Sequence, residues 1–122
     1  MRDARRHPVS RKKQQVRSAF RDGCFRRDGY RCVCCGFQSS PERAEQELDA
    51  HHITDRNEMP NGGYVKENGA TLCKVGNDCH LKAEQYHLTG SAEPGYAPQD
   101  LYAKIGSSHK KAIEKAVEAA GS

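Results

Sequence analysis

The spacing of apolar residues predicts a helix in the first quarter of the chain. Val16, Phe20 and Cys24 recur at intervals of four residues among arginines, which is typical of an amphipathic helix, here from about Gln14 to Arg27. The turn signal Asp28-Gly29 ends this helix. A short strand–turn segment, residues 30–37, is expected to follow and carries the first group of cysteines.

An alternation of side chains predicts a strand near the middle of the chain. From Leu48 to Ile53, successive side chains point to opposite faces, so His51 and His52 should have different surroundings. Before this strand, residues 38–47 are polar and acidic, and we expect a loop with at most one helical turn. After it, residues 54–68 are rich in Asn, Gly and Pro, which predicts a long loop.

Two more helices are expected in the C-terminal half. The residues from Asp78 to His87 are well tolerated in a helix. Residues 89–98 contain Gly, Ser and Pro and should form a linker. A last helix is expected to begin near Ser107 or Ser108, since either side chain can cap it. Together these elements predict an α+β fold.

Composition indicates a small domain that needs a stabilising cross-link. The chain has 122 residues with 35% hydrophobic residues and no Trp, and its mean hydropathy is −0.93. A core this thin usually depends on a metal or on disulfides. No apolar stretch approaches the roughly 20 residues that span a bilayer, and no hydrophobic segment of a secretory signal follows Met1. We therefore expect a cytoplasmic protein without membrane contact, in which paired cysteines bind metal.

Charge is distributed unevenly along the chain. Residues 1–31 hold 11 Lys and Arg against 3 Asp and Glu, whereas residues 32–122 hold 9 against 13. A basic segment of this kind is the expected footprint of contact with a nucleic-acid backbone. Residues 1–13 should form a flexible basic arm, because like charges repel. The arginines expected to contact phosphates are Arg17, Arg21, Arg26 and Arg27.

The cysteines predict a structural zinc site. Cys32 and Cys35 form a Cys-x2-Cys turn, and Cys73 and Cys79 supply a second pair. Zinc takes four thiolates in a closed tetrahedron, and a Cys-x2-Cys turn presents two of them at once. Cys34 could replace Cys35, but a Cys-x-Cys pair is a poorer chelating turn. Without the ion, we expect the domain largely to unfold.

Four segments resemble the HNH nucleases when taken in order. They are residues 27–36, residues 48–53 around His51-His52, the Asn68–Cys73 segment, and Cys79-His80. The resemblance covers roughly residues 20–88. It implies a ββα-metal fold, a β-hairpin followed by a helix around one catalytic metal, with a structural zinc added in members that have paired cysteines. It divides the chain into the arm 1–13, a nuclease domain 14–88, and a linker with a C-terminal helix, 89–122.

The resemblance also implies roles for individual residues. His52 would be the general base, since an imidazole with a pKa near 6.5 can deprotonate water at neutral pH. Asn68 would hold a loop or orient the base. His51, His80 and Glu84 would hold a catalytic divalent ion, Mg²⁺ or Mn²⁺, with Zn²⁺ and Ni²⁺ as further candidates. His87 competes with Glu84 for the last ligand position.

Two features depart from the family pattern. The second cysteine pair is separated by five residues, where the family usually has two, so the insert 74–78 must bulge without displacing either sulfur. In addition, many members carry a second histidine four residues after the Cys-His, and here that position is Glu84.

The resulting hypothesis is a metal-dependent DNA endonuclease of low sequence specificity. It would bind DNA through the phosphate backbone, and a partner protein could supply specificity. Related small nucleases occur in phages, mobile elements and restriction systems, which would place a phage-encoded enzyme in the host cell. The alternatives are a non-catalytic zinc module that binds nucleic acid and a secreted disulfide protein. The sequence leaves the oligomeric state open.

Overall fold

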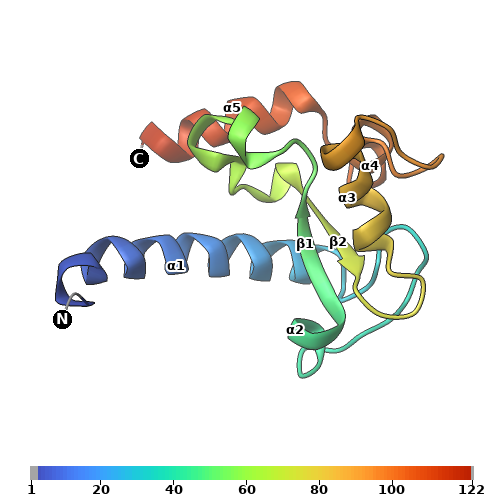
Figure 1. The fold of residues 1–122 in the computed structure, drawn as a ribbon, viewed down its shortest axis with the longest axis horizontal. Helices are drawn as coiled ribbons and strands as arrows, with labels where there is room; N and C mark the ends of the chain where they lie inside the picture. Colours follow the sequence, from blue (N-terminus) through green and yellow to red (C-terminus); the bar gives the residue numbers. More distant parts are fainter. Residues whose placement is uncertain (1–2, 122) are drawn as a thin grey trace.

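The computed structural model describes the backbone of residues 3–121 and the side chains of residues 12–119. The fold is mixed α+β, with a small antiparallel sheet surrounded by helices (Figure 1). The helices and strands are α1 (Asp3–Arg27), α2 (Ala44–Glu47), β1 (Leu48–His52), β2 (Gly69–Cys73), α3 (Cys79–Thr89), α4 (Pro98–Lys104) and α5 (His109–Gly121). Three 3-10 turns, η1 (Arg56–Glu58), η2 (Pro60–Gly63) and η3 (Lys66–Asn68), occupy the predicted loop between the strands.

The two strands form a hairpin-like pair across that long loop. β1 and β2 are antiparallel, and the register joins Leu48 to Cys73 at one end and His52 to Gly69 at the other. The predicted strand over 48–53 is therefore confirmed, with its last residue just outside it. Because β2 leads through a short loop into α3, the order β1–β2–α3 brings the histidine pair, Asn68 and Cys79 into one region.

Helix α1 differs from the sequence expectation. It begins at Asp3 rather than near Gln14, so residues 3–13, expected as a flexible arm, continue the helix. The physical reason is that five of these eleven residues are Arg or Lys, which are strong helix formers whatever their charge. Figure 1 shows the N-terminal half of α1 extending away from the sheet, while its C-terminal half crosses beside β1 and β2.

The C-terminal half of α1 packs closely on the sheet at Gly69. Phe20, Cys24 and Phe25 are buried there. A Cβ atom added to Gly69 would lie 2.4 Å from Cys24 Sγ and 2.7 Å from the Phe20 ring. These distances are far shorter than van der Waals contact, so the absence of a side chain at Gly69 is what allows the helix to approach this strand.

Arg27 fastens the end of α1 to the sheet and to the loop. Its guanidinium pairs with Asp28 at 2.7 Å and donates to the carbonyl oxygens of Lys66 at 2.5 Å and Gly69 at 2.7 Å. Asp28 in turn accepts from the backbone N–H of Thr71 at 3.2 Å. Nearly all donors of Arg27 are thus used inside the protein. Arg27 therefore has a structural role, and its expected contact with a phosphate stays a prediction.

The C-terminal region supports the long loop. Ser108 caps α5 through a hydrogen bond from Lys111 N to Ser108 Oγ at 3.1 Å, which agrees with the predicted start of the last helix. Directly after the expected linker 89–98, however, a helix that was not expected, α4, forms with Pro98 in its first turn. Helix α5 packs against η2 and η3, and Ser107 Oγ donates to Glu67 O at 2.9 Å.

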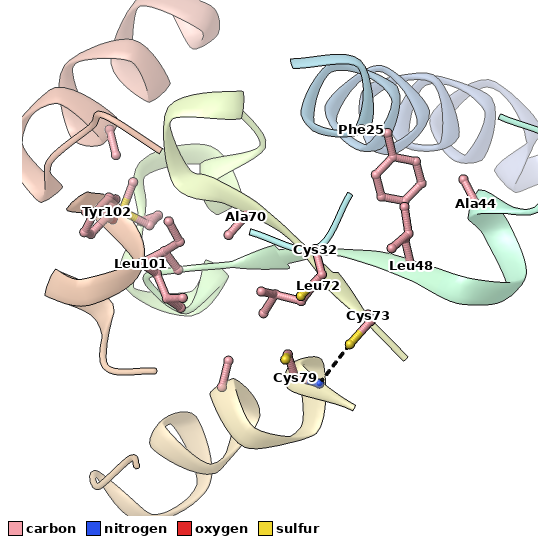
Figure 2. Close-up of a cluster of buried hydrophobic side chains, with 14 of the residues drawn as sticks. Phe25, Cys32, Ala44, Leu48, Ala70, Leu72, Cys73, Cys79, Leu101 and Tyr102 are labelled. Atoms are coloured by element: carbon pink, nitrogen blue, oxygen red, sulfur yellow. Dashed lines mark hydrogen bonds between the residues drawn. The ribbon is translucent and has the colours of Figure 1, made fainter. Parts of the chain in front are cut away.

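The core connects these layers. Figure 2 shows buried side chains from α1, both strands, α3 and α4 meeting around Leu48 and Leu72, with three cysteines among them. Leu101 and Tyr102 of α4 belong to the same cluster. Within residues 3–121, none of the helices has the length and apolar character needed to cross a membrane.

The close approach at Gly69 gives a direct test of the packing. Gly69→Ala should destabilise the protein by about 1–3 kcal/mol, because the new methyl group must displace Cys24 or Phe20. The measurement is the free energy of unfolding in urea, with Gly23→Ala as the matched control. Gly23 lies in α1 with open space around it. Equal stability of the two variants would contradict the packing argument.

Candidate metal centres

Four cysteine sulfurs converge at one point of the fold. The ligand atoms of Cys32, Cys35, Cys73 and Cys79 all lie within 4.8 Å of one another. Three of these residues are buried and Cys35 is exposed at the rim. This group could hold a structural metal ion, as the cysteine spacing predicts. The six cysteines are free thiols in the structure, so no two of these sulfurs are joined.

The distances between the sulfurs suit tetrahedral zinc. A tetrahedron with Zn–S bonds of about 2.3 Å has edges of about 3.8 Å. Cys35 Sγ and Cys73 Sγ are 3.7 Å apart. Two backbone N–H groups point at the sulfurs as well: Cys35 N lies 3.5 Å from Cys32 Sγ, and Cys79 N lies 3.4 Å from Cys73 Sγ (Figure 2). Such donors stabilise the thiolate form that zinc needs.

The choice between Cys34 and Cys35 is resolved by position. Cys34 lies outside the four-sulfur group. Burial raises the pKa of its thiol to about 12. At Cys35 burial acts in the same direction, but hydrogen bonds from Phe37 N, Asn77 and the neighbouring cysteines outweigh it and lower the pKa to about 7. The exposed residue of the pair is therefore the one ready to bind metal.

The insert between Cys73 and Cys79 folds as a tight bulge, as its Gly and Asn content predicts. Gly76 adopts φ +63°, and Asp78 adopts the left-handed conformation at φ 49°. The Asp78 carboxylate then caps α3 by accepting from Leu81 N at 3.2 Å. The reversal at Asp78 places Cys79 at the first position of α3 with its sulfur toward the other three, so the longer spacing is compatible with the site.

A second cluster lies where β1 meets α3. His51 is buried, with 2% of its surface exposed, and its Nδ1 lies 3.4 Å from Glu84 Oε2 without a hydrogen bond. Burial lowers the pKa of His51 to about 3, helped by the neighbouring His87 and His80. The ring is therefore neutral and keeps a lone pair. An unpartnered buried nitrogen facing a carboxylate is an arrangement that could hold a cation.

Glu84 lies between two histidines. Its Oε2 is 3.6 Å from His80 Nε2, in addition to its approach to His51. His80 Nε2 also pairs with Asp49 Oδ2 at 2.9 Å, and this hydrogen bond raises the pKa of His80 despite its burial. Asp49 is a neighbour that the sequence patterns did not single out. Glu84 thus lies within 3.6 Å of both His51 and His80, and its expected role as a metal ligand stays a prediction.

His87 is the other histidine beside Glu84. The ligand atoms of His51, Glu84 and His87 lie within 4.8 Å of one another, and the rings of His51 and His87 stack at 5.1 Å. His87 Nε2 is 2.9 Å from the carbonyl oxygen of His52. Since a carbonyl only accepts, Nε2 carries the proton and Nδ1 keeps its lone pair. Metal-bound histidines typically have such a second hydrogen bond, which favours His87 as a ligand.

His52 faces the other side of β1, as the alternation predicts. Its ring stacks on Phe20 at 4.6 Å and meets Tyr64 edge-on at 4.7 Å. Burial lowers the pKa of His52 to about 4, and the charge of Arg56 adds to the effect. The ring is therefore neutral near pH 7. Nε2 is buried and has no hydrogen-bond partner among the described residues.

Asn68 fixes the loop between the strands. Its side chain accepts from Thr54 N at 3.0 Å and donates to the carbonyl oxygens of Thr54 and Gly63 at 3.1 and 3.3 Å. Tyr102 of α4 donates to Asn68 Oδ1 at 2.7 Å. Of the two roles expected for Asn68, the structure shows the loop-holding one. The part played by Tyr102 had no signal in the sequence, because it lies 34 residues away in a segment for which no element was expected.

The arginines of α1 have different surroundings. Arg21 lies 3.4 Å from Asp22 and 3.5 Å from Glu45, so its charge is largely compensated. Arg26 and Arg17 are exposed. The guanidinium of Arg17 lies 5.9 Å from the centre of the Tyr64 ring, on the side of β1 that carries His52. Of the four arginines expected to contact phosphates, Arg17 and Arg26 remain available.

A cleft of about 940 Å³ opens on the Glu84 side of the cluster. Its lining includes Glu84 and His87 of α3, Asp55 and Glu58 before and in η1, and Tyr102 of α4. Three of these side chains are carboxylates, and no Lys or Arg belongs to the lining. The cleft therefore offers cations an approach to the cluster, and it is unfavourable for a polyanion.

Comparison with protein-family models, with curated proteins and with solved structures finds no match for this chain. The geometry of the two clusters and the resemblance of the short segments are therefore what any functional assignment rests on.

The zinc assignment makes a prediction about two neighbouring cysteines. Cys73→Ser should lose the tightly bound zinc and most of its helical circular dichroism signal, because the ion links the first turn, β2 and α3. Cys34→Ser should keep one zinc per chain and a native spectrum. Metal analysis after gel filtration measures the zinc content. Retention of zinc by Cys73→Ser, or its loss from Cys34→Ser, would contradict the ligand assignment.

Proposed function

We propose that this protein is a metal-dependent endonuclease of the HNH type that hydrolyses phosphodiester bonds in DNA. The observation that carries the proposal is the pair of neighbouring histidines at the end of β1. One is a neutral, unpartnered imidazole facing a carboxylate, and the other is a neutral imidazole on the opposite face. The order β1–β2–α3 around these residues supports the ββα-metal fold that the resemblance implies.

The residues of the second cluster fit a divalent cation. His51 and Glu84 would hold it, together with His87 or His80. Two imidazoles and one carboxylate favour Mn²⁺, Ni²⁺ or Zn²⁺ over Mg²⁺, which prefers oxygen ligands. When bound, such an ion supplies positive charge that stabilises the negative charge growing on the phosphate oxygens. The acidic cleft beside Glu84 is a route by which cations reach this position.

His52 would act as the general base. Because its Nε2 is buried without a partner, Nδ1 is the nitrogen that a water molecule can reach. His52 Nδ1 takes a proton from water as the water oxygen bonds to phosphorus. The bond from phosphorus to the 3′ oxygen breaks, and that oxygen takes a proton from solvent. The products would be a 5′-phosphate and a 3′-hydroxyl.

The positions of β1, α3 and the loop are held by this chain's own contacts. The hydrogen bond from His87 to the His52 carbonyl joins the helix of the metal ligands to the backbone of the base. Asn68 and Tyr102 hold the loop that follows His52. Low sequence specificity is expected, since exposed arginines on α1 contact phosphates rather than bases.

Nicking of supercoiled plasmid tests the proposal. The wild-type protein should nick in Mn²⁺ and not in EDTA, and His52→Ala should lower the rate by a factor on the order of 10²–10⁴. His109→Ala is the matched control, because it removes an exposed histidine of α5. All three proteins should contain equal zinc and have the same circular dichroism spectrum.

Two outcomes would overturn this assignment. If the wild-type protein binds the plasmid but does not cut it with any divalent metal, the protein is a non-catalytic zinc module that binds nucleic acid. If His52→Ala cuts as fast as the wild-type protein, His52 is not the base.

A further inference from the structure

Tyr64 stands at the junction of α1, the strand end and the long loop. Its ring meets His52 edge-on at 4.7 Å and Phe20 edge-on at 5.6 Å. Gly62 makes this position possible, because a Cβ atom there would lie 2.7 Å from the Tyr64 ring. The backbone before Tyr64 is therefore shaped to lay the phenol ring beside the candidate base.

Two guanidinium groups from separate elements converge on this ring. Arg56 Nη1 of η1 donates to the Tyr64 hydroxyl at 3.2 Å, and the guanidinium of Arg17 on α1 lies 5.9 Å from the ring centre. Burial alone would raise the pKa of Tyr64, but the hydrogen bonds from Arg56 and Arg17 outweigh it and lower that pKa. The hydroxyl is thus in a locally positive environment.

These two cations lack the carboxylate partners that Arg21, Arg27 and Arg43 have. Arg21, Arg27 and Arg43 each lie within 3.5 Å of a carboxylate. Within the described side chains, neither Arg17 nor Arg56 forms an ion pair. Asp55, the nearest acidic neighbour of Arg56 in the chain, lines the cleft on the Glu84 side instead. Two guanidinium groups without an ion pair, both beside one tyrosine ring, are suited to an anion.

The cleft on the Glu84 side is unsuited to the same anion. There the cleft carries Asp55, Glu58 and Glu84, and no Lys or Arg. A nucleic-acid strand that approached from that side would bring its phosphates against carboxylates. The charge distribution therefore directs a polyanion to the face that carries α1 and His52.

We propose that Arg17, Arg56 and Tyr64 form a phosphate-binding site for the strand that the enzyme cuts. The guanidinium groups neutralise one backbone phosphate next to the scissile one, and the Tyr64 hydroxyl holds Arg56 in place. Arg56 and Tyr64 are then positioning residues that bring the strand to His52. This inference rests on the proposed nuclease function, and it adds the side from which the strand enters.

Salt-dependent DNA binding tests this site. Each phosphate that a side chain neutralises contributes about 0.9 to the slope of log Kobs against log salt for duplex DNA. Because both side chains act on one phosphate, the double variant Arg17→Gln/Arg56→Gln should lower the slope by about 0.9, and each single variant should lower it by part of that and weaken binding on the order of tenfold. Tyr64→Phe should weaken binding less and leave the slope unchanged, because it keeps both cations. The zinc-loaded protein and a fluorescein-labelled duplex would be measured by anisotropy without other divalent metals.

Arg43→Gln is the matched control. Arg43 is exposed on the α2 side and pairs with Glu47 at 3.2 Å, so its loss should leave the slope unchanged. A competition experiment distinguishes a site for a phosphate of the DNA strand from a site for free inorganic phosphate. Inorganic phosphate should displace the duplex only as well as sulfate does at the same ionic strength. Selective displacement by inorganic phosphate would overturn the proposal in favour of a site for the free ion.

The outcomes also distinguish this inference from the proposed function. Unchanged slopes for Arg17→Gln and Arg56→Gln, in a protein that still nicks plasmid, would overturn the phosphate site alone. Lower slopes in a protein that never nicks would support the phosphate site and overturn the nuclease. A wild-type protein that binds no DNA would overturn both.

Discussion

Four cysteine sulfurs that could hold one metal ion meet at a single point, where three segments of the fold come together. The turn at Cys32, the end of β2 at Cys73 and the start of α3 at Cys79 share few apolar side chains, because the chain has so few to offer. A structural zinc ion contributes on the order of 10 kcal/mol to the folding of small domains, which is comparable to the whole stability of a typical domain. Three of the four cysteines, Cys32, Cys73 and Cys79, are themselves part of the buried core.

Helix α3 connects the four-cysteine site to the cluster of His51, Glu84 and His87. Cys79 is its first residue, and Glu84 and His87 follow at about 7.5 and 12 Å of helical rise. Since the helix is rigid over that length, fixing Cys79 also fixes the side chains that face His51. On the opposite face of β1, helix α1 approaches closely at Gly69. This approach fixes the position of His52, because Phe20 of α1 stacks on the His52 ring. Each histidine is thus positioned by a different helix.

The sequence predicted the parts of this arrangement that depend on local order. The Cys-x2-Cys turn, the alternation that separates His51 from His52, and the cap at Ser108 are set by neighbours in the chain, and all three are present. Contacts between distant segments could not be predicted. Tyr102 contacts Asn68 from a segment for which no element was expected, and the guanidinium of Arg27 is hydrogen-bonded inside the protein. Helix α1 extends further than expected because the helix propensity of Arg and Lys outweighs the repulsion between their charges. The pattern could not decide between Glu84 and His87 for the last ligand position, because both follow His80 on one helix.

The alternation of side chains in β1 also limits where this chain can accept insertions and deletions. A strand repeats every two residues, so inserting or deleting one residue before His51 would turn both histidines to the wrong faces. Residues 74–78 form an exposed bulge whose reversal at Asp78 restores the path of the chain, so this segment can vary in length while the sulfurs stay in place. Natural variants should therefore differ in length at this bulge and keep a constant residue count between Leu48 and His52.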